Sequence, residues 1–328
     1  MYQKNLVMER RKFIKDSAIV GAVAVSPSIM LANSGMYSDE RYRKVHRVLT
    51  AGATFVGTLP ILRAFAGNHT DYVSPFVLFD EFGPVEVAPN TDPLKVEAHP
   101  HAGVTPTTYF VSGSGHHKDS LDYDFEIETG EFMMFSSGSG AIHMEESGNI
   151  LKKDGGIMHG FQIWLNTPKK YKWDAPSTIV NKGKSMPTIV HDDFTAKIIM
   201  GELFGHSAEV ETLSPTFYYH INLEEDKRID IPTDPAHNAF IYVVNGELEI
   251  ENQKSLKKNQ VALYERGKSD INLYAKSKAE FFVLGGKPLD EVVFSYGPFV
   301  MNNEAEIKQC INNYNTGKMG DPKAVNRS

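Results

Sequence analysis

The sequence has 328 residues, of which 41% are hydrophobic and 23% are charged, and its formal net charge is −7. This is the composition of a soluble globular protein, so a disordered chain is excluded. No long basic run is present, and the charge therefore argues against a nucleic-acid-binding protein. At roughly 150 residues per domain, the length predicts two domains.

The chain has a single cysteine, Cys310. A disulfide within the chain is therefore excluded, together with every metal site that needs two thiolates from one chain. We therefore expect nitrogen and oxygen atoms to be the main ligands of any metal that this protein binds.

Residues 1–32 are predicted to be an export signal. A basic stretch at 10–15 precedes an apolar stretch at 18–32, which is shorter than the roughly 20 residues of a membrane-spanning helix. The pair Arg10-Arg11 resembles the twin-arginine export motif. We expect a periplasmic or otherwise exported protein with no membrane span after signal removal; an uncleaved, amphipathic anchor is the alternative. The signal carries +3 of the charge, which leaves −10 for the rest of the chain.

From about residue 43 onward, short runs rich in β-branched and aromatic residues alternate with glycine and proline stops, a pattern typical of an all-β protein. A break is expected at residues 80–84, after the first of these runs. Near the end, Asn303 is placed to cap a helix over residues 304–314, with Gly317 closing it. The predicted strands are 73–79, 107–112, 124–129, 132–135 and 161–165.

One pattern occurs twice, as Tyr109-Phe-Val-Ser-Gly113 and as Tyr242-Val-Val-Asn-Gly246, each followed by further strand-like runs. Two copies of one β unit fit the two-domain estimate, and each copy could curl into a small barrel. The expected organisation is a linker at 33–44, an N-terminal metal-binding domain at 45–205, a metal-free C-terminal domain at 206–302, and a helix and tail at 303–328.

Two short motifs have the residue types of a metal site. In a strand, residues two apart point to the same face, about 6.5 to 7 Å from each other. His99-Pro100-His101 and His143-Met144-Glu145 both have this spacing, and both lie in the first repeat. Three imidazoles and one carboxylate suit iron, manganese, nickel, copper or zinc, and they leave positions open for water or substrate. Either pair alone would more often be structural.

Other histidines have simpler interpretations. His116-His117 lies in a polar stretch and is predicted to be a solvated turn. His159 precedes an apolar run and is predicted to be a core histidine with its hydrogen bonds satisfied. The alternative is that it contacts the metal ligands and supports them without binding the metal. The second repeat contains Asp234 and His237 but no second His-x-His pair, so we expect one metal per chain.

With these residues in hand, the chain resembles the pirin family of bicupins over roughly residues 45–318. The resemblance implies two cupin barrels, or double-stranded β-helices, that face each other, with the terminal helix packed back on the pair. It also implies one metal, usually iron, in the N-terminal barrel, held by His99, His101, His143 and Glu145. The matching motifs are 74–82, 99–101, 117–120, 137–145, 159–166 and 297–302.

The chain departs from the family pattern at three positions near these motifs. Ala102 and Ser139 stand where the family usually has Arg, and Thr105 stands where it usually has Glu. Loss of charge near a metal alters its potential and the pKa of bound water or substrate. Metal binding is therefore expected to carry over from the family better than turnover does.

Pirins are known as flavonol (quercetin) 2,4-dioxygenases and as nuclear, iron-dependent transcription coregulators that act as redox sensors. The resemblance and the export signal together predict a monomeric dioxygenase that uses O2 and Fe(II), or Mn, Ni, Cu, Co or Zn, on quercetin-like flavonols or related phenolics. Glu145 would be the proton acceptor as well as a ligand. The alternatives are a non-catalytic iron- or redox-sensing protein that binds a protein partner, and a metal-binding remnant with a structural role.

Overall fold

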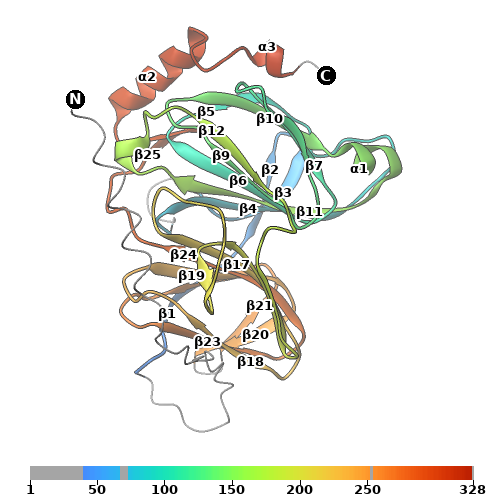
Figure 1. Cartoon of the computed structure of the whole chain (residues 1–328), viewed down its shortest axis with the longest axis vertical. Helices are drawn as coiled ribbons and strands as arrows, with labels where there is room; N and C mark the ends of the chain where they lie inside the picture. Colours follow the sequence, from blue (N-terminus) through green and yellow to red (C-terminus); the bar gives the residue numbers. More distant parts are fainter. Residues whose placement is uncertain (1–39, 67–72, 252–253, 327–328) are drawn as a thin grey trace, which may run out of the picture. The chain divides into compact units, whose positions relative to one another are not determined.

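Strands dominate the structure, and the all-β prediction is confirmed. The computed structural model describes residues 40–66, 73–251 and 254–326, so the predicted export signal lies outside it. The described strands build two barrels, each made of one seven-stranded and one four-stranded sheet (Figure 1). No helix in the described ranges is long and apolar enough to cross a membrane.

The N-terminal barrel contains the predicted metal ligands. Its strands are β2 (Gly52–Val56), β3 (Leu59–Ala66), β4 (Phe76–Val87), β5 (Val96–His101), β6 (Val104–Ser112), β7 (Gly115–Asp119), β8 (Asp124–Ile127), β9 (Phe132–Ser136), β10 (Ala141–Ser147), β11 (Gly156–Asn166) and β12 (Ser177–Asn181), with helix α1 (Asn149–Asp154) and the 3-10 turn η1 (Lys169–Tyr171). The large sheet has the order β12-β9-β6-β11-β4-β3-β2, and the small sheet has the order β5-β10-β7-β8.

The C-terminal barrel repeats this plan. Its strands are β1 (Val45–Thr50), β13 (Thr188–Val190), β14 (Phe194–Met200), β17 (Thr216–Leu223), β18 (Arg228–Pro232), β19 (Asn238–Asn245), β20 (Glu247–Ile250), β21 (Lys254–Lys257), β22 (Gln260–Tyr264), β23 (Asp270–Ala275) and β24 (Ala279–Gly286). The large sheet has the order β1-β22-β19-β24-β17-β14-β13, and the small sheet has the order β18-β23-β20-β21. Two small hairpins are β15 (Glu202–Leu203) with β16 (His206–Ser207), and β25 (Phe294–Tyr296) with β26 (Phe299–Met301).

Strand pairing divides the chain differently from the predicted boundary between residues 205 and 206. β13 and β14 precede that boundary but belong to the C-terminal barrel, where β14 pairs with β17. β1 also belongs there, because it pairs with β22. In the opposite direction, β26 joins the N-terminal barrel, where the Val300 N–H donates to the Ala102 carbonyl at 3.0 Å. Such long-range pairing leaves no local signal in the sequence.

The predicted break at residues 80–84 is wrong, because β4 continues through it. Two buried carboxylates interrupt the apolar pattern there, and each has a partner. Asp80 accepts two hydrogen bonds from Arg63, at 2.6 and 2.7 Å, and Glu81 Oε1 is 2.6 Å from His159 Nε2. A paired carboxylate is tolerated inside a strand. His159 is therefore the satisfied core histidine that the sequence predicted.

The two large sheets pack face to face (Figure 1). Residues from both sheets form one apolar cluster between them. At its centre Phe161 of β11 meets Phe282 of β24 edge to face, with ring centroids 4.6 Å apart. These rings hold equivalent places, because Phe161 is the strand partner of Tyr109, and Phe282 is the strand partner of Tyr242. The pairing thus places the two copies of the repeated motif on either side of the interface.

Each of these two tyrosines reaches across the interface. The Tyr109 hydroxyl is 2.9 Å from Nδ1 of His220 in the C-terminal barrel. The Tyr242 hydroxyl donates to the carboxylate of Glu81 in the N-terminal barrel. Glu81 and His220 are themselves equivalent, since they are the strand partners of Phe161 and Phe282. The barrels are therefore joined by two equivalent tyrosine hydrogen bonds, one to an imidazole and one to a carboxylate.

The glycine that ends each repeated motif is required by the backbone. Gly113 has a φ of +78° and Gly246 a φ of +82°. A Cβ atom at Gly113 would lie 2.7 Å from the carbonyl oxygen of Ile157, and one at Gly246 would lie 2.3 Å from that of Lys278. Only glycine fits this conformation and this space. The internal repeat predicted from the sequence is thereby confirmed as a structural repeat.

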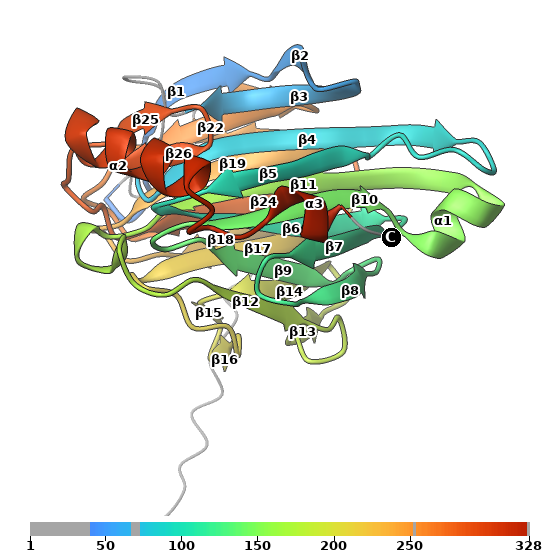
Figure 2. The ribbon, with the colours of Figure 1, turned by 90° about the horizontal axis from the view of Figure 1, so that it is seen from above.

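Helix α3 (Pro322–Val325) lies on the outside of the small N-terminal sheet, and helix α2 (Glu304–Asn315) lies on the hairpin β25–β26 (Figure 2). Asn303 caps α2 as predicted, because its Oδ1 accepts from the Glu306 N–H at 3.0 Å. α2 packs on β26, and α3 packs on β5 and β10. Ile307 and Cys310 of α2 are buried in an apolar cluster with Ile142 and other residues. The predicted metal strands are therefore covered on their outer face.

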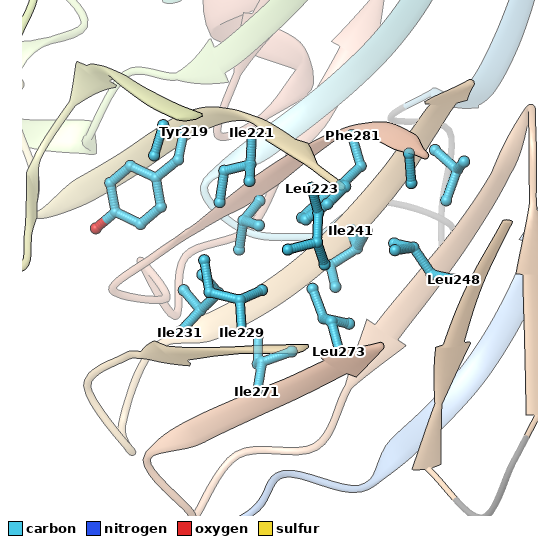
Figure 3. Packing of buried hydrophobic residues seen from close by; sticks show 14 of the residues in the cluster. Tyr219, Ile221, Leu223, Ile229, Ile231, Ile241, Leu248, Ile271, Leu273 and Phe281 are labelled. Carbon is cyan, nitrogen blue, oxygen red and sulfur yellow. The ribbon is translucent and has the colours of Figure 1, made fainter. Parts of the chain in front are cut away.

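Apolar side chains, most of them aliphatic, fill the C-terminal barrel (Figure 3). Ile229 and Ile231 of β18 are the strand partners of Leu273 and Ile271 of β23, and all four pack in the same cluster. Leu248 of β20 joins them and is fully buried. This interior is a packed apolar core.

Candidate metal centre

Three neighbouring strands of the small N-terminal sheet present polar side chains to the barrel interior. β10 lies between β5 and β7. His143 of β10 stands directly opposite His99 of β5, and Glu145 stands directly opposite His117 of β7. Residues two apart on a strand share a face, so His101 joins His99 on the inner side.

The three predicted histidine ligands converge. One ring nitrogen from each of His99, His101 and His143 lies within 4.8 Å of the others. The Nε2 atoms of His99 and His143 are 3.0 Å apart. Two nitrogens bound about 2.1 Å from one metal at a right angle would also be separated by about 3.0 Å. The imidazoles are thus spaced as ligands of a single ion would be.

Hydrogen bonding and burial prepare these imidazoles to bind a metal. Nδ1 of His99 is 2.9 Å from the Glu97 carbonyl, and Nδ1 of His101 is 3.2 Å from the Pro298 carbonyl. A nitrogen that donates to a carbonyl carries the ring hydrogen, which leaves Nε2 with a free lone pair. Burial lowers the pKa of His99, and it holds the pKa of His101 and of His143 well below the usual value. All three rings are therefore neutral near pH 7, as metal binding requires.

Glu145 supplies the carboxylate of the group. It is half-buried and accepts a hydrogen bond from the Thr108 hydroxyl at 2.9 Å. An oxygen of Glu145 lies within 4.8 Å of ring nitrogens of His143 and His117. His99, His101, His143 and Glu145 together form a set of three nitrogens and one oxygen, which suits a divalent first-row metal. We call these four residues the histidine–glutamate group.

His117 was missed by sequence reasoning. The prediction of a solvated turn at His116-His117 is wrong, because both residues lie on β7 and His117 is fully buried. The stretch around them is polar, and polarity usually indicates a turn. The spacing of His117 and Asp119 is nevertheless the same i, i+2 spacing as in the two predicted motifs. That spacing was the signal that could have found it.

An ionised carboxylate orients His117. Asp119 Oδ2 is 3.1 Å from His117 Nε2 and 2.5 Å from the Thr178 hydroxyl. Burial acts to raise the pKa of Asp119, but hydrogen bonds from His117, Thr178 and the Leu121 amide hold it below the usual value. The carboxylate therefore fixes the ring hydrogen on Nε2 of His117. Nδ1 is left bare, buried and without a hydrogen-bond partner in the part of the chain that the structure describes.

A cavity of about 790 Å³ opens onto the histidine–glutamate group and is lined by His99, His101 and Glu145. Its other walls come mainly from apolar residues of the β2–β3 turn, β4, β5 and the segment 293–300. Trp164 of β11 also lines it, and the indole stands edge-on to His101 with ring centroids 4.8 Å apart. The volume is that of a typical small-molecule site, and its apolar lining suits a flat aromatic ligand.

A buried lysine fixes the segment that closes one side of this cavity. Lys172 Nζ donates to the carbonyls of Gly103 and Val300, at 2.6 and 2.7 Å, and to the side chain of Asn166 at 2.6 Å. Burial lowers the pKa of Lys172 to about 7. Gly103 is two residues after His101, and Val300 is two residues after Pro298, whose carbonyl contacts His101. Lys172 thus holds in place the backbone that orients His101.

Thr108 is the residue of β6 that contacts Glu145. None of the three residues that depart from the family pattern lies on the same face of β6 as Thr108. Thr105 lies on the opposite face of β6 from Thr108, and its hydroxyl contacts the Thr167 hydroxyl at 3.3 Å. Ala102 belongs to the apolar cluster under helix α2. Ser139 lies in the turn before β10, where its N–H donates to the Asp174 carbonyl.

The fold and this group define a bicupin with a candidate metal site in its N-terminal barrel. Two domain models match the chain: the pirin domain at residues 59–165 and the pirin C-terminal cupin domain at residues 218–320. A pirin-like protein of Solanum lycopersicum is 30% identical over 85% of this chain and 94% of its own length. The chain belongs to the pirin family.

Solved structures show the same fold. A quercetin 2,3-dioxygenase from Acinetobacter baumannii is 28% identical, with a TM-score of 0.82 over 86% of this chain and 99% of its own. A bacterial pirin from Escherichia coli, solved in complex with nickel(II), is 17% identical, with a TM-score of 0.57 over 74% of this chain and 99% of its own. At that identity the second match supports the fold alone.

Proposed function

We propose that this pirin is a metal-dependent dioxygenase of quercetin-like flavonols or related phenolics. The observation that carries the proposal is the cavity of about 790 Å³, which opens directly onto His99, His101 and Glu145 and is walled mainly by apolar groups. A flat phenolic ring system could enter it and present an oxygen to the histidine–glutamate group. The similarity to the quercetin 2,3-dioxygenase of Acinetobacter baumannii supports this substrate class.

The residues present fit a metal ion. The histidine–glutamate group offers three neutral nitrogens and one carboxylate oxygen, and we propose Fe(II) as the ion, with Mn, Ni, Cu, Co and Zn as other candidates. When bound, the metal would supply Lewis-acid and template chemistry for the reaction of the phenolic substrate with O2. His117 lies beside this group, because one of its ring nitrogens is within 4.8 Å of His143 and Glu145, and Asp119 holds its Nε2.

The chain's own groups would bind the substrate and take its proton. Glu145 accepts the proton of the substrate hydroxyl, and Thr108 holds that carboxylate in place through the hydrogen bond of 2.9 Å. The indole of Trp164 and the apolar walls hold the ring system and exclude water from the site. Burial keeps the ligand histidines neutral throughout.

The test combines metal content with turnover. The protein is loaded with Fe(II), mixed with quercetin and oxygen near neutral pH, and followed by the loss of flavonol absorbance. We expect turnover by the wild type, no metal and no turnover in His101→Ala, and wild-type behaviour in His206→Ala, a control at an exposed histidine. Bound iron without turnover would contradict the dioxygenase proposal and favour the alternative, a non-catalytic iron- or redox-sensing protein that binds a partner.

We also propose that residues 1–32 direct twin-arginine export, which would place the protein in the periplasm or otherwise outside the cytoplasm. The proposal is supported by Arg10-Arg11 and the short apolar stretch that follows. Changing both arginines to lysine should keep the protein in the cytoplasm with its signal uncleaved, as followed by cell fractionation. Continued export of that variant would contradict the proposal.

A further inference from the structure

We propose that Arg63, held by Asp80, binds a second oxygen of the substrate, a ring hydroxyl or carboxylate at the end remote from the histidine–glutamate group. This inference rests on the proposed function, since it concerns the same cavity and the same substrate class. In this role Arg63 determines which of the aromatic ligands that can reach the histidine–glutamate group bind tightly.

A row of polar side chains crosses the cavity wall in register. Thr108 of β6 is the strand partner of Gln162 of β11, Gln162 is the partner of Asp80 of β4, and Asp80 is the partner of Arg63 of β3. Gln162, Asp80 and Arg63 all line the cavity. The row begins beside the metal group, because Thr108 donates to Glu145.

The length of the row matches a ligand of two or three rings. Adjacent strands lie about 4.8 Å apart, so β3 is about 14 Å from β6 across three spacings. The Arg63 guanidinium is bound to Asp80 and therefore reaches back over β4, about 10 Å from β6. An aromatic ligand that presents one oxygen to the histidine–glutamate group could place a remote oxygen at Arg63.

The guanidinium is rigidly held and has donors to spare. Nε and Nη2 of Arg63 donate to the two oxygens of Asp80 at 2.7 and 2.6 Å. The Asp80 side chain is 5% exposed, whereas that of Arg63 is 33% exposed. A guanidinium carries five N–H groups, and among the described residues no other hydrogen bond of Arg63 is found. Donors that face the cavity are therefore free for a ligand.

These free donors select for oxygen. A ligand that fills the cavity displaces water from Arg63, and a ligand without an acceptor there leaves charged donors unpaired. A hydroxyl or carboxylate at that end replaces the lost water. Because Asp80 already balances the charge of Arg63, the ligand oxygen does not have to be anionic.

The experiment compares two ligands on the full-length, metal-loaded protein in the absence of O2. Quercetin carries several hydroxyls, whereas 3-hydroxyflavone keeps the metal-binding hydroxyl and ketone but lacks all the others. Affinities are measured by the absorbance shift of the bound flavonol. We expect Arg63→Met to weaken quercetin binding at least tenfold and to change 3-hydroxyflavone binding less than twofold. Lys182→Met, which removes a positive charge from the same barrel outside the cavity lining, is the control and should change both less than twofold.

A second variant guards against misfolding, because Arg63→Met leaves the Asp80 carboxylate buried without its partner. Arg63→Gln combined with Asp80→Asn keeps a neutral hydrogen-bonded pair and should show the same selective loss of quercetin affinity. If the wild type binds both ligands and neither variant separates them, or if Lys182→Met loses as much affinity as Arg63→Met, the role of Arg63 is overturned alone. If the wild type binds neither ligand, the proposed function fails, and this inference fails with it.

Discussion

The two barrels share one topology and differ in what fills them. In the C-terminal barrel, strands β18, β23 and β20 point Ile229, Ile271, Leu248 and their neighbours into a closed apolar core. In the N-terminal barrel, the corresponding strands β5, β10 and β7 carry histidines and carboxylates, and three of these residues, His99, His101 and Glu145, line a cavity of about 790 Å³. Among the residues that the structure describes, both clusters of potential metal ligands lie in the N-terminal barrel.

The difference indicates that one copy of the repeat mainly stabilises the fold and the other mainly provides the binding site. A filled apolar interior stabilises a fold, whereas a hollow interior with buried polar atoms destabilises it. Nδ1 of His143 and Nδ1 of His117 are both buried without a hydrogen-bond partner among the described residues. We infer that the C-terminal barrel stabilises the pair and provides the packed face against which the functional barrel is held.

The largest expected effect comes from giving the N-terminal barrel the interior of its neighbour. His143→Leu removes a central histidine and its unpartnered nitrogen, so metal affinity should fall by more than about a hundredfold, while the metal-free protein should be no less stable than the wild type. Metal titration and thermal unfolding in chelator measure the two quantities. His237→Leu in the other barrel is the control and should leave metal affinity unchanged. A large loss of stability in metal-free His143→Leu would contradict the division of roles.

The converse change weakens the filled barrel. Leu248→Ala empties part of a fully buried core and should lower the free energy of unfolding by about 2 to 5 kcal/mol. Metal affinity, measured on the folded fraction, should not change. Leu59 borders the cavity, and solvent can enter the space that Leu59→Ala leaves. The loss in free energy of unfolding for this variant should therefore be at the lower end of that range. Denaturant unfolding compares the pair, and an equal or larger loss for Leu59→Ala would count against the comparison.

The reciprocal tyrosines test the interface between the barrels. Tyr242→Phe deprives the buried Glu81 carboxylate of a donor and should cost about 1.5 to 3 kcal/mol, as expected for a hydrogen bond to a charged group. Tyr109→Phe removes a bond to the imidazole of His220 and should cost about 0.5 to 1.5 kcal/mol. Each variant is its partner's control in chemical denaturation. The reverse order of the two losses would show that the equivalence of the two sites is only geometric.

The smallest effect concerns pH and Lys172. Burial lowers the pKa of Lys172 to about 7 in the folded protein, against an ordinary lysine value of 10.5 in the unfolded chain. Above pH 7 the unfolded chain therefore binds more protons, so this group makes the free energy of unfolding rise with pH, by about 1 kcal/mol from pH 7 to 8. Below pH 7 both states are protonated and the contribution is flat. The slope should disappear in Lys172→Met; an unchanged slope would mean that other groups cause it.

The sequence predicted the ligand strands because their chemistry is local. His99 with His101, and His143 with Glu145, are two residues apart, and a strand brings such residues to one face whatever the rest of the chain does. His117 has the same spacing to Asp119 but was hidden by the polar residues around it. The boundary between the barrels was not predictable, because β1 and β14 are assigned by pairing with strands far along the chain. The cavity likewise depends on the distant segment 293–300, which closes it.

The most direct test of the account is the position of the metal. Crystals of the protein loaded with Fe(II) should give one strong anomalous peak per chain, bounded by His99, His101, His143 and Glu145. A peak in the C-terminal barrel, or one held by His117 without His99 and His101, would contradict the central claim that the N-terminal barrel binds the metal through the histidine–glutamate group.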